Sequence, residues 1–108
     1  MLLSMADPLA QIDRKAFTAQ LHTRFNVQTD GANPISLELD EVKDLPSPPA
    51  YDAFALVFRG PAHTRLPQQT HRFDHESLGS FDIFMTAIAG DSESIFYEAV
   101  FNRKRKPA

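Results

Sequence analysis

The chain has 108 residues, of which 43% are hydrophobic and 23% charged, and its formal net charge is −3. This length suits one domain with a buried core, and the hydrophobic share excludes a wholly disordered chain. Because the chain has no cysteine, disulfides, thiolate metal sites, iron–sulfur clusters and cysteine nucleophiles are all excluded.

Charge is distributed unevenly along the chain. The last six residues, 103–108, hold four basic side chains in a row, from Arg103 to Lys106, so residues 1–102 carry a net charge of −7. An acidic body argues against a broad nucleic-acid face, and we expect no nucleic-acid partner. We interpret the basic tail as a solvated terminus.

The first residues resemble neither a leader nor an anchor. Met1–Asp7 lacks a cationic start, and Asp7 interrupts its short apolar run, so we predict no signal peptide. No stretch approaches the roughly 18 apolar residues of a membrane helix, and we expect no membrane partner. The expected location is the cytoplasm or an assembled appendage.

Met5 is an alternative start of the chain, and residues 1–12 are predicted to form an N-terminal extension of the domain.

One short helix is predicted after this extension. Asp13 is suited to cap it, and the helix is expected to continue to about Leu21. Phe17 and Leu21 are four residues apart and therefore share a face. A helix this short is not stable alone, so it should pack on the rest of the domain.

The remaining sequence alternates between apolar and polar residues, which predicts strands. The six expected strands span residues 23–28, 35–42, 53–59, 70–76, 81–88 and 95–102. The third of them, strand three, has apolar residues on both faces, because Ala55 and Val57 alternate with its phenylalanines, so it should be central in the sheet.

Glycines and one proline mark the expected turns. Gly31 follows Asp30 in a hairpin signal between strands one and two, and Gly79 suits a positive φ between strands four and five. Gly60 and Pro61 are expected to end strand three.

Residues 45–52 interrupt the strand pattern with three prolines in four positions. Pro46, Pro48 and Pro49 favour a stiff, extended arm, which loses little entropy on docking. With Tyr51 they are the predicted partner-contact residues. The alternative is a loop that simply crosses one end of the sheet.

These elements predict a mainly β fold with a single domain over residues 13–102. Six antiparallel strands with short turns and one short N-terminal helix indicate either a sandwich or a partly open barrel.

The sequence carries no pattern that predicts catalysis. His71 and His75 lie on one face of strand four, but at about 3.3 Å per residue they are too far apart to share a metal ion. Gly90-Asp91-Ser92 resembles a serine motif, but no histidine follows it. The four glycines occur singly, so there is no phosphate loop. We predict no enzyme activity, no catalytic residue, no metal site and no cofactor.

Four segments together resemble a family of small bacterial proteins of unknown function, over roughly residues 13–103. The segments are Phe54-x-Leu56-x-Phe58-Arg59-Gly60-Pro61, Leu66-Pro67-Gln68, His75-x-x-Leu78-Gly79-x-Phe81-x-Ile83-Phe84 and Tyr97-Glu98-Ala99-Val100-Phe101-Asn102. The resemblance implies no known activity. It implies an association with phage-tail-collar-like neighbours, and hence an accessory or assembly role in a tail-like structure.

The resulting hypothesis is a structural or interaction protein that binds a protein partner through a sheet edge or the proline-rich arm. An exposed edge would also permit self-association. The alternative is a small β-barrel whose phenylalanine-rich interior holds an apolar small molecule.

Overall fold

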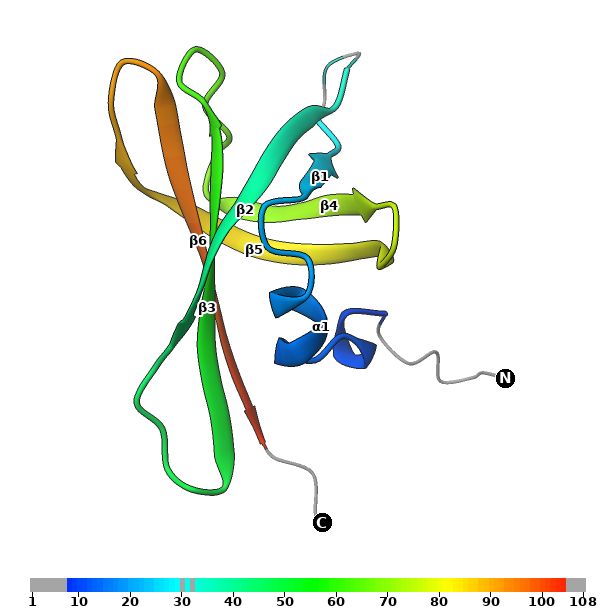
Figure 1. Cartoon of the computed structure of the whole chain (residues 1–108). Coiled ribbons are helices and arrows are strands. Elements are labelled where there is room, and N and C mark those ends of the chain that lie inside the picture. The colour runs from blue at the N-terminus through cyan, green and yellow to red at the C-terminus, as the bar shows by residue number, and fades with distance from the viewer. Residues whose placement is uncertain (1–7, 30, 32, 105–108) are drawn as a thin grey trace.

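A computed structural model describes residues 8–29, 31 and 33–104 (Figure 1). It contains a 3-10 helix, η1 (Pro8–Gln11), an α-helix, α1 (Arg14–Thr18), and six strands. The strands are β1 (Arg24–Val27), β2 (Ile35–Asp44), β3 (Tyr51–Pro61), β4 (Gln69–His75), β5 (Gly79–Gly90) and β6 (Ser94–Lys104). Every neighbouring pair is antiparallel, and the order β1-β2-β3-β6-β5-β4 closes into a barrel. The mainly β prediction is confirmed, and the structure selects a closed barrel over a sandwich or a partly open barrel.

The barrel is paired unevenly around its circumference. β3 and β6 are in register along their whole length, from Tyr51 opposite Lys104 to Pro61 opposite Ser94. The closing seam between β1 and β4 is short, with Asn26 opposite Asp74 and the next residues of the two strands paired beside them. In Figure 1, β2, β3 and β6 run steeply while β4 and β5 cross them. The long strands extend beyond the barrel as a ribbon.

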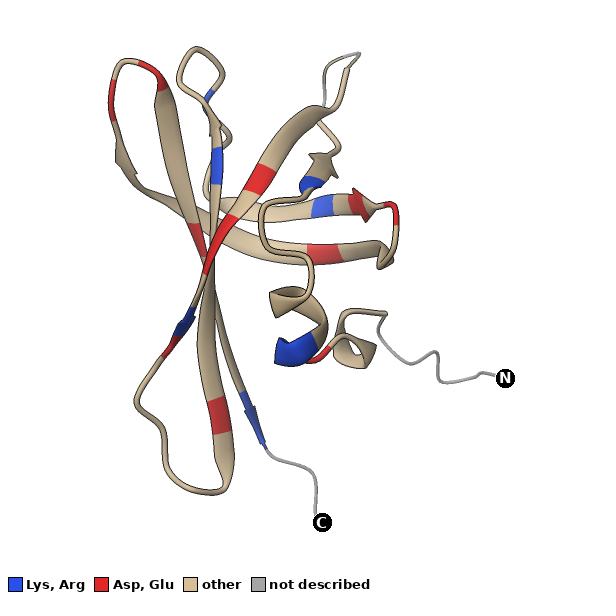
Figure 2. Ribbon diagram, viewed as in Figure 1, with Lys and Arg blue, Asp and Glu red and all other residues tan. Residues whose placement is uncertain are grey.

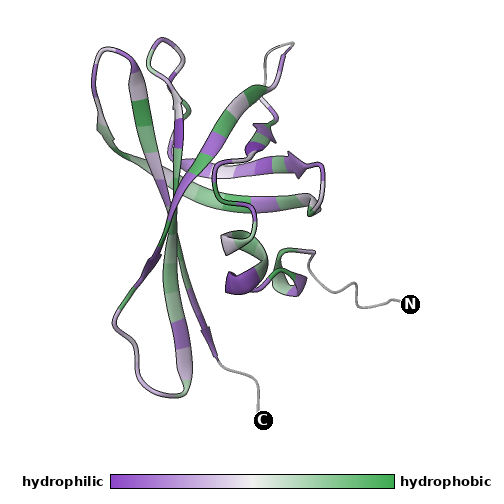
Figure 3. Cartoon of the chain, in the orientation of Figure 1, coloured by the Kyte–Doolittle hydropathy of each residue, from purple (hydrophilic) through white to green (hydrophobic). Residues whose placement is uncertain are grey.

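Hydrophobic and hydrophilic bands alternate along the strands, as expected from the sequence (Figure 3). The inward side chains of β3 include Phe54, Leu56 and Phe58, all with no exposed surface. Its outward Ala55 and Val57 are also buried. The sequence predicts that strand three is central in a sheet, but in the closed barrel every strand has two neighbours and none is central.

α1 places a phenylalanine at the base of the barrel. Asp13 caps the helix by accepting the Ala16 N–H (2.8 Å), as predicted. Phe17 is fully buried among aromatic rings that come from β3, β5 and β6. No helix in the described part of the chain is long and apolar enough to cross a membrane.

The helix is shorter than predicted, because it ends at Thr18 and not near Leu21. Tight turns follow it, with the Gln20 N–H bonded to the Phe17 carbonyl (2.9 Å). They reverse the chain so that the His22 N–H can bond to the Leu39 carbonyl of β2 (2.7 Å). A contact with a residue distant in sequence therefore ends the helix.

Strand three is longer than predicted at both ends. It begins at Tyr51, and it passes through Gly60 and Pro61 instead of stopping before them, because the long partner β6 keeps these residues in register. Position 60 requires glycine because of close packing, and not because the chain turns there. A Cβ atom there would lie 2.5 Å from Cδ2 of the buried Leu37.

The predicted basic tail begins inside a strand. β6 continues to Lys104, and Arg103 donates to the carbonyls of Ile12 (2.6 Å) and Leu9 (2.9 Å). Ile12 is buried and Leu9 packs against the core, so the end of the predicted extension belongs to the domain. Residues 1–7, with Met1 and Met5, and residues 105–108 lie outside the described residues.

The two turn glycines differ. Gly79 has φ of 84°, in the left-handed region that favours glycine, at the start of β5. Gly31 lies between β1 and β2, and its N–H donates to the Thr29 hydroxyl (3.2 Å). Both of its chain neighbours, at positions 30 and 32, lie outside the described residues.

Candidate functional site

The barrel interior is a packed aromatic core. Phe58 lies between Phe25 and Phe73, with ring centroids 5.3 and 5.2 Å away, and Phe81 completes the cluster. These four side chains are at most 1% exposed. An apolar ligand inside the barrel would have to displace rings that are already in contact, which disfavours the small-molecule alternative.

A fork between two strands forms a groove on the outside of the barrel. β5 pairs with β6 only from Thr86 onward, and before that residue it pairs with β4 alone. Past the Thr86–Glu98 pair the two strands diverge, and β6 continues beside β3 (Figure 1). In the described part of the chain, no strand pairs with either edge inside the fork.

This fork groove has a volume of about 400 Å³ and an apolar lining. Phe84 of β5 and Val100 of β6 are 54% and 61% exposed there, although both are large apolar residues. Leu9 of η1 and Phe101 form part of the floor. The groove therefore offers apolar contacts next to two strand edges that pair with no strand in the described residues, with η1 packed against β5 beside them.

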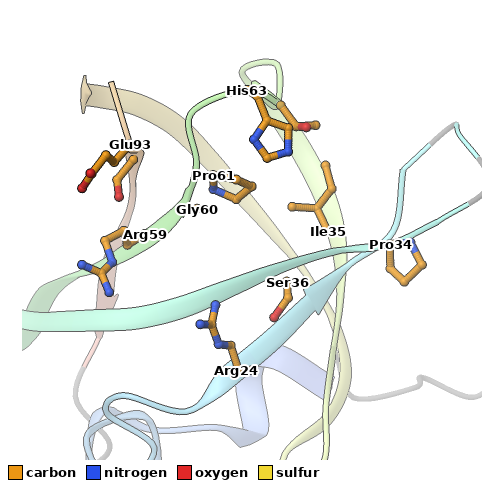
Figure 4. A pocket seen from close by; sticks show the side chains of 11 residues that line it. Arg24, Pro34, Ile35, Ser36, Arg59, Gly60, Pro61, His63 and Glu93 are labelled. Carbon is orange, nitrogen blue, oxygen red and sulfur yellow. The ribbon is translucent and has the colours of Figure 1, made fainter. Parts of the chain in front are cut away.

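A second, larger groove of about 620 Å³ lies at the opposite end of the barrel (Figure 4). Arg24 and Arg59 come from the strands on either side of β2, and Figure 4 shows both guanidinium groups beside the groove, with His63 farther along it. Arg59 donates to Glu38 (3.2 Å), and Glu93 also lines the groove. The acidic groups offset the two arginines, so the groove suits polar groups but carries no strong field of one sign. Figure 2 shows both charge signs spread over the strands.

The proline-rich arm forms the tip of the β2–β3 hairpin, which projects beyond the barrel (Figure 1). Pro46, Pro48 and Pro49 are exposed there. The tip is closed by the Tyr51 N–H, which bonds to the Pro48 carbonyl (2.9 Å). Tyr51 itself is 37% exposed and belongs to β3. The arm is thus a compact hairpin tip with an accessible proline surface.

The histidines considered from the sequence are not brought together as ligands. His71 and His75 point into the barrel and are buried. The His71 ring bonds through Nε2 to the Pro67 carbonyl (2.8 Å). The His75 Nδ1 accepts the Ser77 N–H (2.9 Å). Both rings therefore serve local structure.

The acidic residues around the β4–β5 turn also have structural partners. Arg72 and Asp82 are directly opposite, with Arg72 Nε 3.3 Å from Asp82 Oδ1. Asp74 accepts from Ser80 and Gln28, and these hydrogen bonds lower its pKa. Ser80 lies on β5 and Gln28 directly follows β1, and both strands are neighbours of β4, so these hydrogen bonds join adjacent parts of the barrel.

Asp91 of the Gly90-Asp91-Ser92 motif likewise closes a turn. Its carboxylate accepts the backbone N–H groups of Glu93 (2.8 Å) and Ser94 (2.9 Å), and these bonds lower its pKa. The motif is part of a hairpin between β5 and β6, whereas a serine nucleophile of that type requires a strand-to-helix turn.

The sequence analysis missed one group of residues of the types that bind metal ions. His22, Glu38 and Asp40 each place one ligand atom within 4.8 Å of the other two. The hydrogen bond from His22 lowers the pKa of Glu38, and Arg59 lowers it further. Glu38 and Asp40 are two residues apart on one strand face, which the alternation shows. The proximity of His22 depends on β1 pairing with β2, which the sequence alone does not place.

Comparison with known proteins gives one match. A family model described as a domain of unknown function (DUF6916) matches residues 12–101. The search of curated proteins and the search of solved structures each returned no match.

Proposed function

The chain belongs to the DUF6916 family, a domain of unknown function, and we propose that it is a non-catalytic module that binds a protein partner. The fork groove is the observation that carries this proposal. Phe84 and Val100 are more exposed than any other large apolar side chain in the described residues. Burying them against a partner would remove apolar surface from water.

The geometry of the fork favours one kind of partner segment. The edges of β5 and β6 carry backbone groups that no neighbouring strand uses on that side in the described residues. An extended chain can pair with such an edge while its side chains occupy adjacent pockets. The partner segment is therefore an extended strand with apolar side chains at alternate positions.

We propose the hairpin tip as a second contact, through Pro46, Pro48, Pro49 and Tyr51. The exposed prolines support this role, since a stiff loop loses little entropy on binding. We further propose, from the resemblance in sequence, that the partner belongs to a phage-tail-like assembly in a bacterium. The protein would then act in the cytoplasm or within the assembled appendage.

The absence of catalysis is also part of the proposal. Each carboxylate with a shifted pKa in the described residues has a local partner that explains the shift. Catalytic groups with shifted pKa values instead pair with one another or lie in a cleft without such partners.

The test is affinity purification of the tagged chain from the organism that encodes it, with mass spectrometry and an untagged control. We expect one stoichiometric protein partner. The double variant Phe84→Ser/Val100→Thr should lose it, whereas Ile88→Ser should retain it. Ile88 is a matched control because it is 48% exposed on β5 but lies outside the fork groove.

The outcomes separate the two surfaces. If Pro48→Ser/Pro49→Ser alone abolishes the interaction, the hairpin tip is the binding surface and the fork is not. If the wild-type chain is recovered alone under several growth conditions, the proposal is wrong. Thermal unfolding of each variant must match the wild type, so that a lost partner is not confused with a lost fold.

A further inference from the structure

A cluster on the outer face of β2 has the composition and geometry of a cation site. We infer that His22, Glu38 and Asp40 bind one divalent transition-metal ion. Their ligand atoms lie within 4.8 Å of one another. Two ligands of one zinc ion, each about 2.0–2.2 Å from it, are at most about 4.4 Å apart. The His22 side chain is 68% exposed, so its ring has room to rotate by the small amount required.

The fold brings the three side chains together from β2 and from the turn that precedes β1. The His22 N–H bonds to the carbonyl of Leu39 (2.7 Å), the residue between Glu38 and Asp40. This bond holds His22 beside β2. A bulge in β2 leaves Asp40 without a partner residue on β3, since Leu39 pairs with Phe58 and Glu41 with Val57. Asp40 therefore lies on the outer surface next to Glu38 and is not held by a neighbouring strand on that side.

The Glu38 carboxylate is already oriented for such a role. Its Oε1 accepts from Arg59 (3.2 Å), while its Oε2 faces His22 Nδ1 (3.3 Å). One oxygen is thus fixed by a guanidinium, and the other points to the cluster. Carboxylate ligands of metals are commonly held in this way by an outer hydrogen-bond partner.

Asp40 supplies the second negative charge. It is half-buried and forms no ion pair with any residue in the described part of the chain. Arg59 pairs with Glu38 and with no other carboxylate among the described residues, so the charge of Asp40 has no ion-pair partner of its own there. A bound divalent ion would offset the repulsion between the two carboxylates.

The donor set selects the class of ion. One imidazole nitrogen and two carboxylate oxygens suit Zn²⁺, Mn²⁺ or Co²⁺, whereas soft ions such as Cu⁺ prefer sulfur. Three protein ligands leave at least one position for water or for a carboxylate of a partner. The site lies on β2 and on the turn before β1, away from the fork between β5 and β6, so it can exist whether or not the proposed partner binding is correct.

The test uses the full chain without a purification tag, because histidine tags bind the same ions. Calorimetry with Zn²⁺ should give one site per chain. Mn²⁺ should broaden backbone NMR signals centred on His22 and on residues 38–40. His22→Gln and Asp40→Asn should each weaken Zn²⁺ binding at least roughly tenfold, the smallest effect expected even for an outer-shell partner.

Two matched controls show whether the effect is specific. His63→Gln removes another exposed histidine, and Asp82→Asn removes a carboxylate exposed on β5; both should bind Zn²⁺ as the wild type does. The inference is overturned if Zn²⁺ fails to bind at about 1 mM, where only very weak sites stay empty. It is equally overturned if His22→Gln and Asp40→Asn bind normally, or if the broadening centres on His63.

Discussion

At the residue scale, His75 requires the neutral form of its ring. Its Nδ1 accepts the N–H groups of Ser77 (2.9 Å) and Leu78 (3.2 Å), so that nitrogen carries no proton. Its Nε2–H then donates to the Thr23 hydroxyl (2.9 Å), whose own proton goes to the Gln20 carbonyl. Burial lowers the pKa of His75 below the ordinary 6.5, and the charge of Glu76 opposes this only partly.

This arrangement predicts a loss of stability in mild acid. With a folded-state pKa below 6.5, the contribution of His75 is complete above pH 6.5 and declines as the pH falls from there toward the folded-state value. His75→Asn keeps an acceptor near the Nδ1 position and cannot titrate. Urea unfolding should therefore show a smaller fall in the free energy of unfolding between pH 7.5 and 5.5 in this variant than in the wild type.

The control for this prediction is His63→Asn, because His63 is exposed. It should keep the wild-type pH dependence. The same pH dependence in all three proteins would mean that another group, and not His75, is responsible.

At the scale of elements, α1 shows how a short helix is stabilised by tertiary contacts. Its five residues are too few for a helix that is stable alone. Arg14 pairs with Asp44 of β2 and Asp52 of β3, and its guanidinium lies 5.3 Å from the centre of the Phe54 ring. Phe17 closes the base of the barrel. The basic first turn, unfavourable for the helix dipole, is thus compensated by acidic residues of the strands.

Phe17→Ala should therefore destabilise the whole domain. Removing a fully buried phenylalanine costs about 3–5 kcal/mol. Lys15→Ala, on the exposed side of the same helix, should change the free energy of unfolding by no more than about 0.5 kcal/mol. Equilibrium urea unfolding measures both, and equal effects would contradict the role of Phe17 as the base of the core.

At the scale of the whole molecule, closure of the barrel is uneven. β3 and β6 pair along their full length, whereas β1 and β4 pair only at Asn26–Asp74 and Val27–Phe73. The Gln28 N–H adds one bond to the Arg72 carbonyl at this seam (2.9 Å). Regions with few pairings open with a lower free energy than the global unfolding reaction.

Native-state hydrogen exchange should reveal this difference. The Gln28 amide at the seam should exchange through a local opening, while amides in the centre of the β3–β6 pair, such as Leu56, should exchange only on global unfolding. Adding a low concentration of urea should accelerate Leu56 more steeply than Gln28, because global unfolding exposes more surface. Equal urea dependence at both sites would show that the seam opens only with the whole barrel.

Much of the local structure was predictable from the sequence. Period-two alternation placed all six strands, and the cap at Asp13 placed the helix start. These features follow from side-chain direction and local hydrogen bonding, which neighbouring residues determine. The strand ends were less predictable, since Gly60 and Pro61 remain in β3 through pairing with β6, and Arg103 remains in β6 through pairing with Asp52 of β3.

The candidate sites depended on contacts between distant parts of the chain. The alternating residues 81–88 and 95–102 indicate strands, but not that β5 leaves β6 after the Thr86–Glu98 pair and exposes Phe84 and Val100. The cluster of His22 with Glu38 likewise exists because β1 pairs with β2 and a turn brings His22 beside it.

The sequence by itself therefore determined the kind of protein: a mainly β domain with a short helix and a phenylalanine-rich core. Closure of the barrel, the fork and the ligand cluster were decided only by the tertiary structure. The physical reason is that periodicity specifies which face of a strand is buried, whereas strand order and divergence depend on which packing of all six strands fills the core.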